Sequence, residues 1–367
     1  MTEGQVIKAA RLLQFRSNEE GRALIPRARY ALLLALVTAA VADVGILFVL
    51  WPHGMAVDFS VFWQAARDLH PYAFSRSPFG NPPTALLFFK PLEILPLRPA
   101  FALWDAAGLA CFLWLGSRLY GMRAAILGVV SPAIVMALAA GQISLIVGSL
   151  VFAAFLAEPI FCGILLGIAA CLKPQMVFLA PLLFLFAREI QPLAAFCATG
   201  VGLSLVATAV FGPSIWTDWL HGMQNLLVVA EHRHALSLTI SPMTYGLPFG
   251  LLSAGLAVLG LYQCRNLRNE HRAAAVVAAS LFAAPYALLY DLAPLVVFAA
   301  LPILRGSNWR SFGAALTYSA GLGPFSIPAL WPSLLEFGEK DRSYRPSLPV
   351  PKPARSRRTW ITPTRSA

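Results

Sequence analysis

Charged side chains are scarce in this sequence. Only 12% of its 367 residues are Asp, Glu, Lys or Arg, whereas 58% are hydrophobic. A soluble domain carries roughly 25% charged residues, so this chain has too little charge to cover a globule of its size. The composition excludes an ordinary soluble protein and indicates a polytopic membrane protein.

Negative charge is scarcer than positive charge: the chain has 17 Asp and Glu against 28 Lys and Arg, and its net charge is +11. A surplus of positive charge is typical of nucleic-acid binding when it forms one patch. Here many Lys and Arg lie in the two end segments, 1–29 and 336–367. Such segments set the topology of a membrane protein and contact anionic lipids. We therefore expect membrane lipids, and no nucleic acid, as partners.

Cysteine is also sparse and forms no framework. The five residues, an odd number, lie in or near apolar runs, and no two have the spacing of a metal-ligand pair. We interpret all five as small buried hydrophobic residues and not as a disulfide frame. They are Cys111, Cys162, Cys171, Cys197 and Cys264.

What the chain has is a series of apolar runs near membrane length. The fold predicted from them is all-α, a bundle of about 10–12 transmembrane helices. A further apolar region, 311–335, is interrupted by Gly and Pro and predicts one span or two half-spans. The expected spans are about 30–51, 99–117, 123–140, 142–157, 159–172, 174–187, 192–212, 248–263, 273–289 and 292–304.

The charges predict how the bundle is oriented. With 1–29 as a cytoplasmic basic leader, the short inner turns carry a series of arginines, as the positive-inside rule requires. Two long segments, about 52–98 and 213–247, then face outside within a membrane domain of 30–335. The Pro-rich basic tail, 336–367, is expected to be disordered. The inner arginines are Arg118, Arg123, Arg188, Arg265, Arg268, Arg272, Arg305 and Arg310.

The first outer segment opens with an amphipathic stretch. Its apolar residues recur at the spacing of one helix face. This pattern predicts an interfacial helix with its rings in the headgroup layer and Asp58 fixed at its start. The second outer segment has a similar aromatic stretch. The apolar face of the first consists of Phe59, Phe62, Trp63 and Ala66.

Polar residues gather at the predicted outer face from at least six segments of the chain. Polar groups at membrane depth are costly and mark function. Each one alone also has a structural explanation: a helix cap for Asp58 or Asp291, a snorkelling helix end for Lys173, a tight turn for Gln142. Their collection on one side favours a site. The set is Asp58, Asn81, Lys90, Gln142, Lys173, Gln175, His232, Arg233, His234, Tyr290 and Asp291.

The order of short motifs resembles that of glycosyltransferase family 87, whose members are integral membrane enzymes of the GT-C type. The likeness covers about residues 45–305. In place of the Gly-x-x-x-Tyr-like and Tyr-Pro-Pro-like elements usual in the family, this chain has His70-Pro71-Tyr72 and Asn81-Pro82-Pro83. The motifs are Asp-Phe-x-x-Phe-Trp-x-Ala from Asp58, then Asn81-Pro82-Pro83, Gly141-Gln142-Ile143-Ser144, Leu172-Lys173-Pro174 and Tyr290-Asp291-Leu292.

The resemblance implies a GT-C-like bundle whose two long outer loops carry interfacial helices. It also implies transfer of a hexose, with mannose expected, from a polyprenyl-phosphate sugar to an envelope glycolipid or glycan. The reaction would take place at the outer face of a bacterial-type inner membrane. A phosphate leaving group already carries its charge, so no metal or other cofactor is expected. His232 and His234 have the spacing of a metal pair, but nothing near them in the sequence completes a site.

Roles follow from the chemistry of such a transfer. Asp58, matched by its place in the motif, would be the general base that accepts the proton of the acceptor hydroxyl. Positive charge must stabilise the departing phosphate; Lys173 and Arg233 would supply it, with His232 and His234 as secondary donors. The residues expected to bind sugar or acceptor hydroxyls are Asn81, Gln142, Gln175, Tyr290 and Asp291.

Two other functions remain open from the sequence. A transporter or flippase for lipid-linked sugars would show inverted repeats and polar groups near the bilayer midplane; no repeat is visible, and the polar set is displaced outward. A scaffold subunit of an envelope polysaccharide system would use small residues for helix packing, as any bundle does. Such residues are Gly163, Gly167, Gly200 and Gly202.

Overall fold

The computed structural model describes residues 55–68, 70–72, 79–232 and 241–305, and a few single positions outside these ranges. Every regular element in this part of the chain is a helix, which confirms the all-α prediction. The basic leader, most of the first expected span and the Pro-rich tail lie outside the described residues. Their predicted roles stay predictions.

Three helices are long and apolar enough to cross a membrane: α4 (Leu97–Tyr120), α10 (Ile190–Phe211) and α12 (Leu247–Cys264). A fourth candidate is the pair α5 (Met122–Val129) and α6 (Pro132–Ala140), which is bent by 61° at its break. These 3 helices, or 4 with the bent pair, confirm a polytopic membrane protein. The expected total of about 10–12 crossings stays a prediction.

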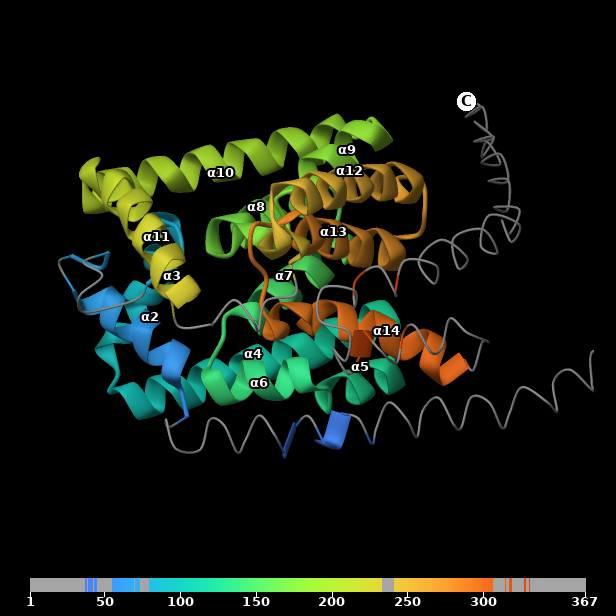
Figure 1. Cartoon of the computed structure of the whole chain (residues 1–367), viewed down its shortest axis with the longest axis horizontal. Helices are drawn as coiled ribbons and strands as arrows, with labels where there is room; N and C mark the ends of the chain where they lie inside the picture. The colour runs from blue at the N-terminus through green and yellow to red at the C-terminus, as the bar shows by residue number, and fades with distance from the viewer. Residues whose placement is uncertain are drawn as a thin grey trace, which may run out of the picture.

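Shorter helices fill the interior between the long ones (Figure 1). Small residues let them approach closely, as in other membrane bundles. A Cβ at Gly163 would lie 2.8 Å from the Cβ of Ala195, so Gly163 allows α8 to pack on α10. Gly200, in contrast, has nothing within 4 Å of its Cβ position. The shorter helices are α7 (Ser144–Leu156), α8 (Pro159–Leu172), α9 (Ala180–Ala187), α13 (Asn269–Ala283) and α14 (Ala293–Arg305), with 3₁₀ turns η3 (Pro174–Met176), η5 (Pro242–Tyr245) and η6 (Leu289–Leu292).

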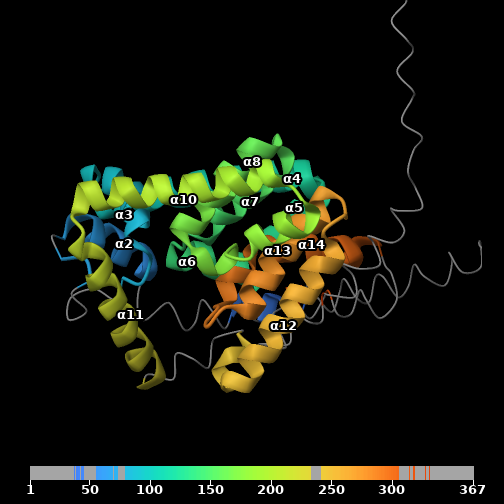
Figure 2. The ribbon, with the colours of Figure 1, turned by 90° about the horizontal axis from the view of Figure 1, so that it is seen from above.

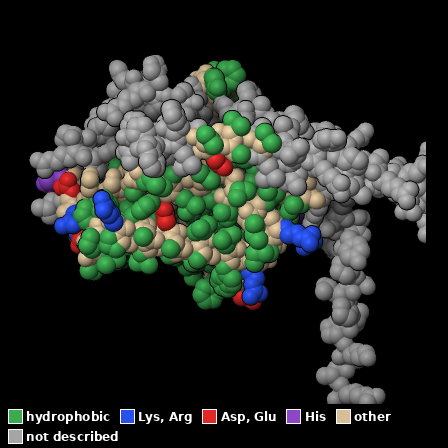
Figure 3. All heavy atoms as spheres, turned by 90° about the horizontal axis from the view of Figure 1, so that it is seen from below, with side chains coloured by type: hydrophobic (Ala, Val, Ile, Leu, Met, Phe, Trp, Pro, Cys, Tyr) green, Lys and Arg blue, Asp and Glu red, His purple; other side chains and the backbone are tan. Residues whose placement is uncertain are grey.

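The two ends of the bundle differ in character. One end, here called the α2 end, holds α2 (Val57–Arg67), α3 (Pro83–Phe89), the 3₁₀ turn η2 (Lys90–Ile94) and α11 (Ser214–His232). The opposite end, here called the basic end, holds the turns α4–α5, α9–α10 and α12–α13 (Figures 1 and 2). Between the ends, the face seen in Figure 3 is mostly hydrophobic, with Lys and Arg toward both ends. The arginines that the sequence analysis assigned to one side lie in these turns or in the adjoining helix ends: Arg118, Arg123, Arg188, Arg265 and Arg268.

Helix α2 is held against the end of α6. Gly141 terminates α6 with a φ of 70°, and a Cβ at this position would lie 2.5 Å from the Cβ of Phe59. The Ala56 N–H donates to the Ala139 carbonyl at 2.9 Å. Only glycine combines this backbone conformation with so close an approach. The contact fixes the first turn of α2, and with it Asp58.

The aromatic face of α2 lies inside the protein and not in the headgroup layer as expected. Phe59 and Phe62 are buried, and the ring of Phe62 stacks on Phe89 of α3 with centroids 4.7 Å apart. Phe59 lies against Trp104 of α4 with centroids 5.8 Å apart. The sequence shows that a helix has an apolar face but not what covers it; here α3 and α4 cover it. Trp63 is half-buried, and its Nε1–H donates to the Leu95 carbonyl at 3.0 Å.

The cysteines are free thiols, but not all are buried. Cys162, Cys171 and Cys264 lie in the interior as expected, whereas Cys111 and Cys197 are exposed. The exposed two lie on α4 and α10, which are membrane-length helices whose outer surface is apolar. A small apolar side chain on such a surface faces lipid rather than a protein core.

We expect Gly141→Ala to destabilise the protein by about 2–4 kcal/mol, because a left-handed alanine and an overpacked contact each cost about 1–2 kcal/mol. Thermal unfolding of the detergent-solubilised protein measures the loss. Gly200→Ala is the matched control: its Cβ has free space, and alanine favours helix by up to about 1 kcal/mol. Equal melting temperatures for the two variants would contradict the close approach of α2 to Gly141.

Candidate functional site

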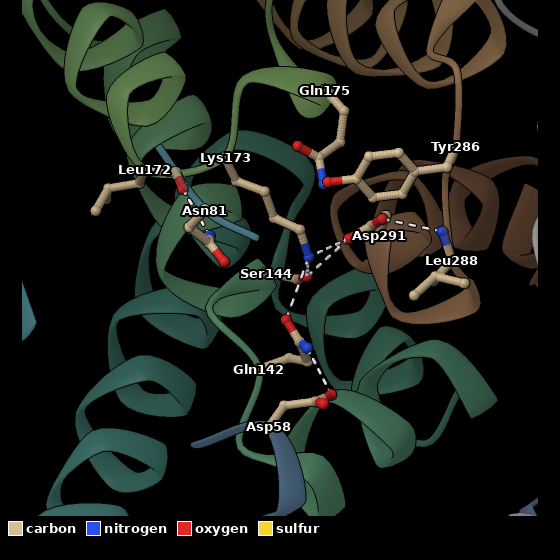
Figure 4. A network of polar contacts seen from close by, with 10 residues as sticks. All are labelled: Asp58, Asn81, Gln142, Ser144, Leu172, Lys173, Gln175, Tyr286, Leu288 and Asp291. Atoms are coloured by element: carbon tan, nitrogen blue, oxygen red, sulfur yellow. Dashed lines mark hydrogen bonds and ion pairs between the residues drawn. The ribbon is translucent and has the colours of Figure 1, made fainter. Parts of the chain in front are cut away.

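A chain of polar contacts links α2 to the interior of the bundle (Figure 4). The Gln142 Nε2–H donates to Asp58 Oδ2 at 2.5 Å. The Lys173 ammonium donates to Gln142 Oε1 at 3.2 Å and to Ser144 Oγ at 2.9 Å. It also forms an ion pair with Asp291. These five residues are called the polar cluster below.

The cluster forms where helices are interrupted. Gln142 follows the glycine that ends α6, and Ser144 is the first residue of α7. Lys173 caps the end of α8 before Pro174, and Asp291 lies in the 3₁₀ turn before α14. Helix ends leave backbone groups without partners, and irregular backbone inside a membrane bundle must be satisfied by protein groups. Three such interruptions meet here, which explains why polar side chains gather.

The end of α8 is tied to the segment around α3. The Asn81 Nδ2–H donates to the Leu172 carbonyl at 2.9 Å, and the Thr84 hydroxyl donates to the Cys171 carbonyl at 2.6 Å. Two carbonyls that a helix end would leave orphaned are therefore satisfied by another segment. The Asn81 side chain is half-buried, and its Oδ1 has no hydrogen-bond partner within the described ranges. That oxygen can accept from a ligand hydroxyl.

Asp291 is the fixed point of the cluster. Its side chain is fully buried, Oδ1 accepts from Ser144 Oγ at 3.1 Å, and Oδ2 accepts from the Leu288 N–H at 3.0 Å. It therefore serves both as the helix cap and as a member of the clustered site, the two readings that the sequence left open. Both of its oxygens are occupied by protein donors.

Lys173 does not snorkel to the surface. It is only 5% exposed, and its ammonium lies 4.5 Å from the centroid of the Tyr290 ring. An ammonium has three hydrogens, and three oxygens, on Gln142, Ser144 and Asp291, already receive them. In this arrangement no hydrogen of Lys173 remains for a phosphate. Lys173 can stay buried instead of reaching the surface because Asp291 is its counter-ion. An unpaired ammonium would be costly at this depth.

Asp58 is the accessible member of the cluster. It is half-buried in the first turn of α2, and Gln142 is the hydrogen-bond partner of Oδ2. Burial raises the pKa of Asp58, while the hydrogen bond from Gln142 and the charge of Lys173 lower it; the net direction is upward. A carboxylate with a raised pKa binds a proton more readily than an exposed one, as a general base must.

The other predicted residues are distributed around this cluster or outside it. Gln175 Nε2–H lies 3.4 Å from the Tyr286 hydroxyl, at the side of the cluster in Figure 4. Lys90 is not part of the cluster; its ammonium donates to the Ala66 carbonyl and to Glu93. Arg233, His234 and the side chain of His232 lie outside the described residues. Their roles stay predictions.

Sequence reasoning assigned no role to two residues found here, Ser144 in the polar cluster and Tyr286 beside it. Ser144 lies two residues after Gln142, and Tyr286 lies four residues before Tyr290; both spacings are visible in the sequence. The described residues contain no group of three or more His, Cys, Asp or Glu that could hold a metal ion. The cluster thus offers the Asp58 carboxylate, whose Oδ1 has no hydrogen-bond partner among the described residues, one amide, and a fixed buried cation.

Comparison with known proteins places the sequence in a family. Residues 79–290, more than half of the chain, match the sequence model of glycosyltransferase family 87. No curated protein and no solved structure matches the chain. The matched range includes Asn81, Gln142, Lys173 and Tyr290. It begins after Asp58, so the match does not bear on the role of that residue.

Asp291→Asn should lower the free energy of unfolding by about 3–5 kcal/mol, because it leaves the buried Lys173 ammonium without its counter-ion. Denaturant or thermal unfolding in detergent measures this loss. The double variant Lys173→Met, Asp291→Asn removes both charges and should recover most of the stability. The single variant Lys173→Met completes the comparison. If the double variant lost as much stability as the two single variants added together, the pair would not be coupled.

Proposed function

Because the chain belongs to glycosyltransferase family 87, we propose that it transfers a hexose, with mannose the expected sugar, from a polyprenyl-phosphate sugar to an envelope glycolipid or glycan. The acceptor hydroxyl gives its proton to Asp58. The observation that carries this proposal is the contact of Asp58 with Gln142, which joins a half-buried carboxylate to a buried cation.

The proposed step is a displacement at the anomeric carbon of the donor sugar. The acceptor oxygen forms a bond to that carbon while its proton moves to Asp58 Oδ1. The bond from the carbon to the phosphate oxygen breaks, and the phosphate leaves with the electron pair. Gln142 occupies Oδ2 and so directs Oδ1 toward the acceptor. A carboxylate positioned in this way contributes through general base catalysis.

Lys173 acts in this proposal through position and field. Its three hydrogens hold Gln142, Ser144 and Asp291, so it orients the amide that in turn orients Asp58. Its positive charge favours the ionised form of Asp58. Direct contact with the departing phosphate then falls to Arg233, with His232 and His234 as further donors. This division of roles differs from the expectation that Lys173 binds the phosphate itself.

Sugar hydroxyls would bind beside the cluster. Asn81 offers an Oδ1 that no described residue contacts, and Gln175 with Tyr286 offers an amide and a phenol at the opposite side in Figure 4. The ring of Tyr290 forms the wall behind Lys173. A few directed polar groups against apolar walls are typical of small-ligand sites.

The α2 end would face the exterior of the inner membrane. The opposite end carries the arginine-containing turns, and the positive-inside rule places such turns in the cytoplasm. Helices α3 and α11 at the outer end, whose Phe88, Trp216 and Trp219 are only partly buried, would then border the donor's prenyl chain. Lipid-linked donor and acceptor would meet Asp58 from that side.

A transporter or flippase for lipid-linked sugars is the second candidate, and one observation favours it. Helix interruptions that meet inside a bundle are typical of secondary transporters. A flippase moves its lipid without forming a glycosidic bond. Formation of a new glycolipid by the purified protein, with release of polyprenyl phosphate, decides between the two functions.

We expect Asp58→Asn to lower transfer by about 100- to 10,000-fold, the usual contribution of a general base. The assay uses reconstituted protein, a polyprenyl-phosphate sugar and a glycolipid acceptor, with thermal unfolding as the check of the fold. Asp68→Asn is the matched control, because this aspartate lies at the other end of α2, where its carboxylate accepts from the His70 N–H. Near-normal transfer by Asp58→Asn would exclude Asp58 as the base.

Gln142→Ala should move the acidic limb of the pH profile of kcat/KM to higher pH. The amide hydrogen bond lowers the pKa of Asp58, so its loss raises that pKa further, and the ionised base is then lost at a higher pH as the solution is acidified. Gln175→Ala should lower the rate without moving this limb. A limb that stays in place or moves to lower pH in Gln142→Ala would contradict the role of Gln142.

A further inference from the structure

A cavity of about 390 Å³ lies at the basic end, away from the polar cluster. It is formed where the end of α7 meets the first turns of α8, α10 and α13. Apolar residues such as Ala154, Phe155 and Pro159 form part of its wall, and its charged side chains are Arg188, Glu189 and Arg272. Nothing in the proposed transfer uses these residues.

Two arginines give the cavity its positive charge. Arg272 has a side chain only 12% exposed and is ion-paired with Glu189 through one nitrogen. Its Nε–H is buried without a hydrogen-bond partner in the described part of the chain. Arg188 ends α9 in the left-handed conformation, with a φ of 59°. An arginine offers five N–H donors in a planar fork that suits phosphate oxygens, and Glu189 engages only part of that capacity.

Three helices begin at the cavity wall. The cavity wall includes Pro159 at the start of α8, Ile190 at the start of α10 and Asn269 at the start of α13. Helix N-termini carry partial positive charge and attract anions. The Asn269 side chain is already engaged, since its Nδ2–H donates to the Phe155 carbonyl at 2.8 Å. Glu158 precedes α8 but is exposed and outside the wall. The balance of the cavity is cationic.

Exposed apolar residues next to wall residues in the sequence are called the rim below. Leu156, Ile160 and Phe161 flank wall residues in the sequence and are 46%, 52% and 60% exposed. In a membrane protein such side chains face acyl chains. The arrangement therefore suits a molecule with an anionic head and an apolar tail.

We propose that this cavity binds the phosphate of an anionic phospholipid from the leaflet at the basic end. The phosphate contacts Arg272 and Arg188, and the acyl chains follow the exposed residues of the rim. Free phosphate shares the same head chemistry but lacks the tail. The site is separate from the donor and acceptor of the proposed glycosyl transfer.

Thermal unfolding and native mass spectrometry of the full chain in detergent test the site, with phosphatidylglycerol, phosphatidylcholine or inorganic phosphate added. We expect phosphatidylglycerol to bind and to raise the melting temperature more than phosphatidylcholine does. Arg272→Gln should weaken phosphatidylglycerol binding by about tenfold, the effect of losing a hydrogen bond to a charged group. Arg188→Asn should also weaken phosphatidylglycerol binding; asparagine is used because it tolerates the left-handed backbone conformation of this position.

Two matched variants make the result specific. Arg118→Gln removes one exposed arginine from the same end but outside the cavity, and should leave phosphatidylglycerol binding unchanged. Glu189→Gln frees Arg272 and removes a negative charge, so it should strengthen phosphatidylglycerol binding. This variant tests the site by itself if Arg272→Gln does not fold. Equal responses to the two lipids, or equal losses in Arg118→Gln and Arg272→Gln, would overturn the proposal. Full stabilisation by inorganic phosphate alone would overturn the lipid assignment.

Discussion

Placing the ammonium of Lys173 inside an apolar bundle is strongly unfavourable unless an opposite charge meets it there, and Asp291 is that charge. The rest of the site is arranged around this pair. Ser144 bridges the two side chains, Leu288 donates to the far oxygen of Asp291, and Gln142 carries the influence of the lysine to Asp58. Since each partner is already satisfied, the pair is a rigid support rather than a free binding group.

Many helix boundaries were predictable from proline and glycine residues in the sequence. Pro159 at the start of α8, Gly141 at the end of α6 and Pro174 after Lys173 mark helix boundaries close to those observed. The expected span 123–140 was wrong in one respect, because it ran through Pro132, where the structure breaks it into α5 and α6. These residues act locally, through a fixed φ or a missing Cβ, so the sequence alone reveals their effect. Burial of the α2 rings was not predictable in the same way. Periodicity identifies an apolar face, but lipid and protein cover such a face equally well.

The site was predictable in membership more than in arrangement. Alternating the predicted spans across the membrane placed four polar residues at the same face: Asp58, Gln142, Lys173 and Asp291. The ion pair between Lys173 and Asp291, in contrast, joins segments far apart in the chain. No local pattern encodes such a contact. Tyr286 was overlooked because a tyrosine in an apolar run has an ordinary core explanation, and its contact with Gln175 exists only in three dimensions.

The bonds from Asn81 and Thr84 to the last carbonyls of α8 have a consequence for biogenesis. Residues near 80 leave the ribosome well before those near 170, and chains assemble from their N-terminal parts onward during synthesis. The donors are therefore already at hand when α8 arrives, and its exposed terminus finds them on insertion. A deletion that removes Asn81 and Thr84 would leave the last carbonyls of α8 without these partners inside the bilayer, where unsatisfied polar groups are costly.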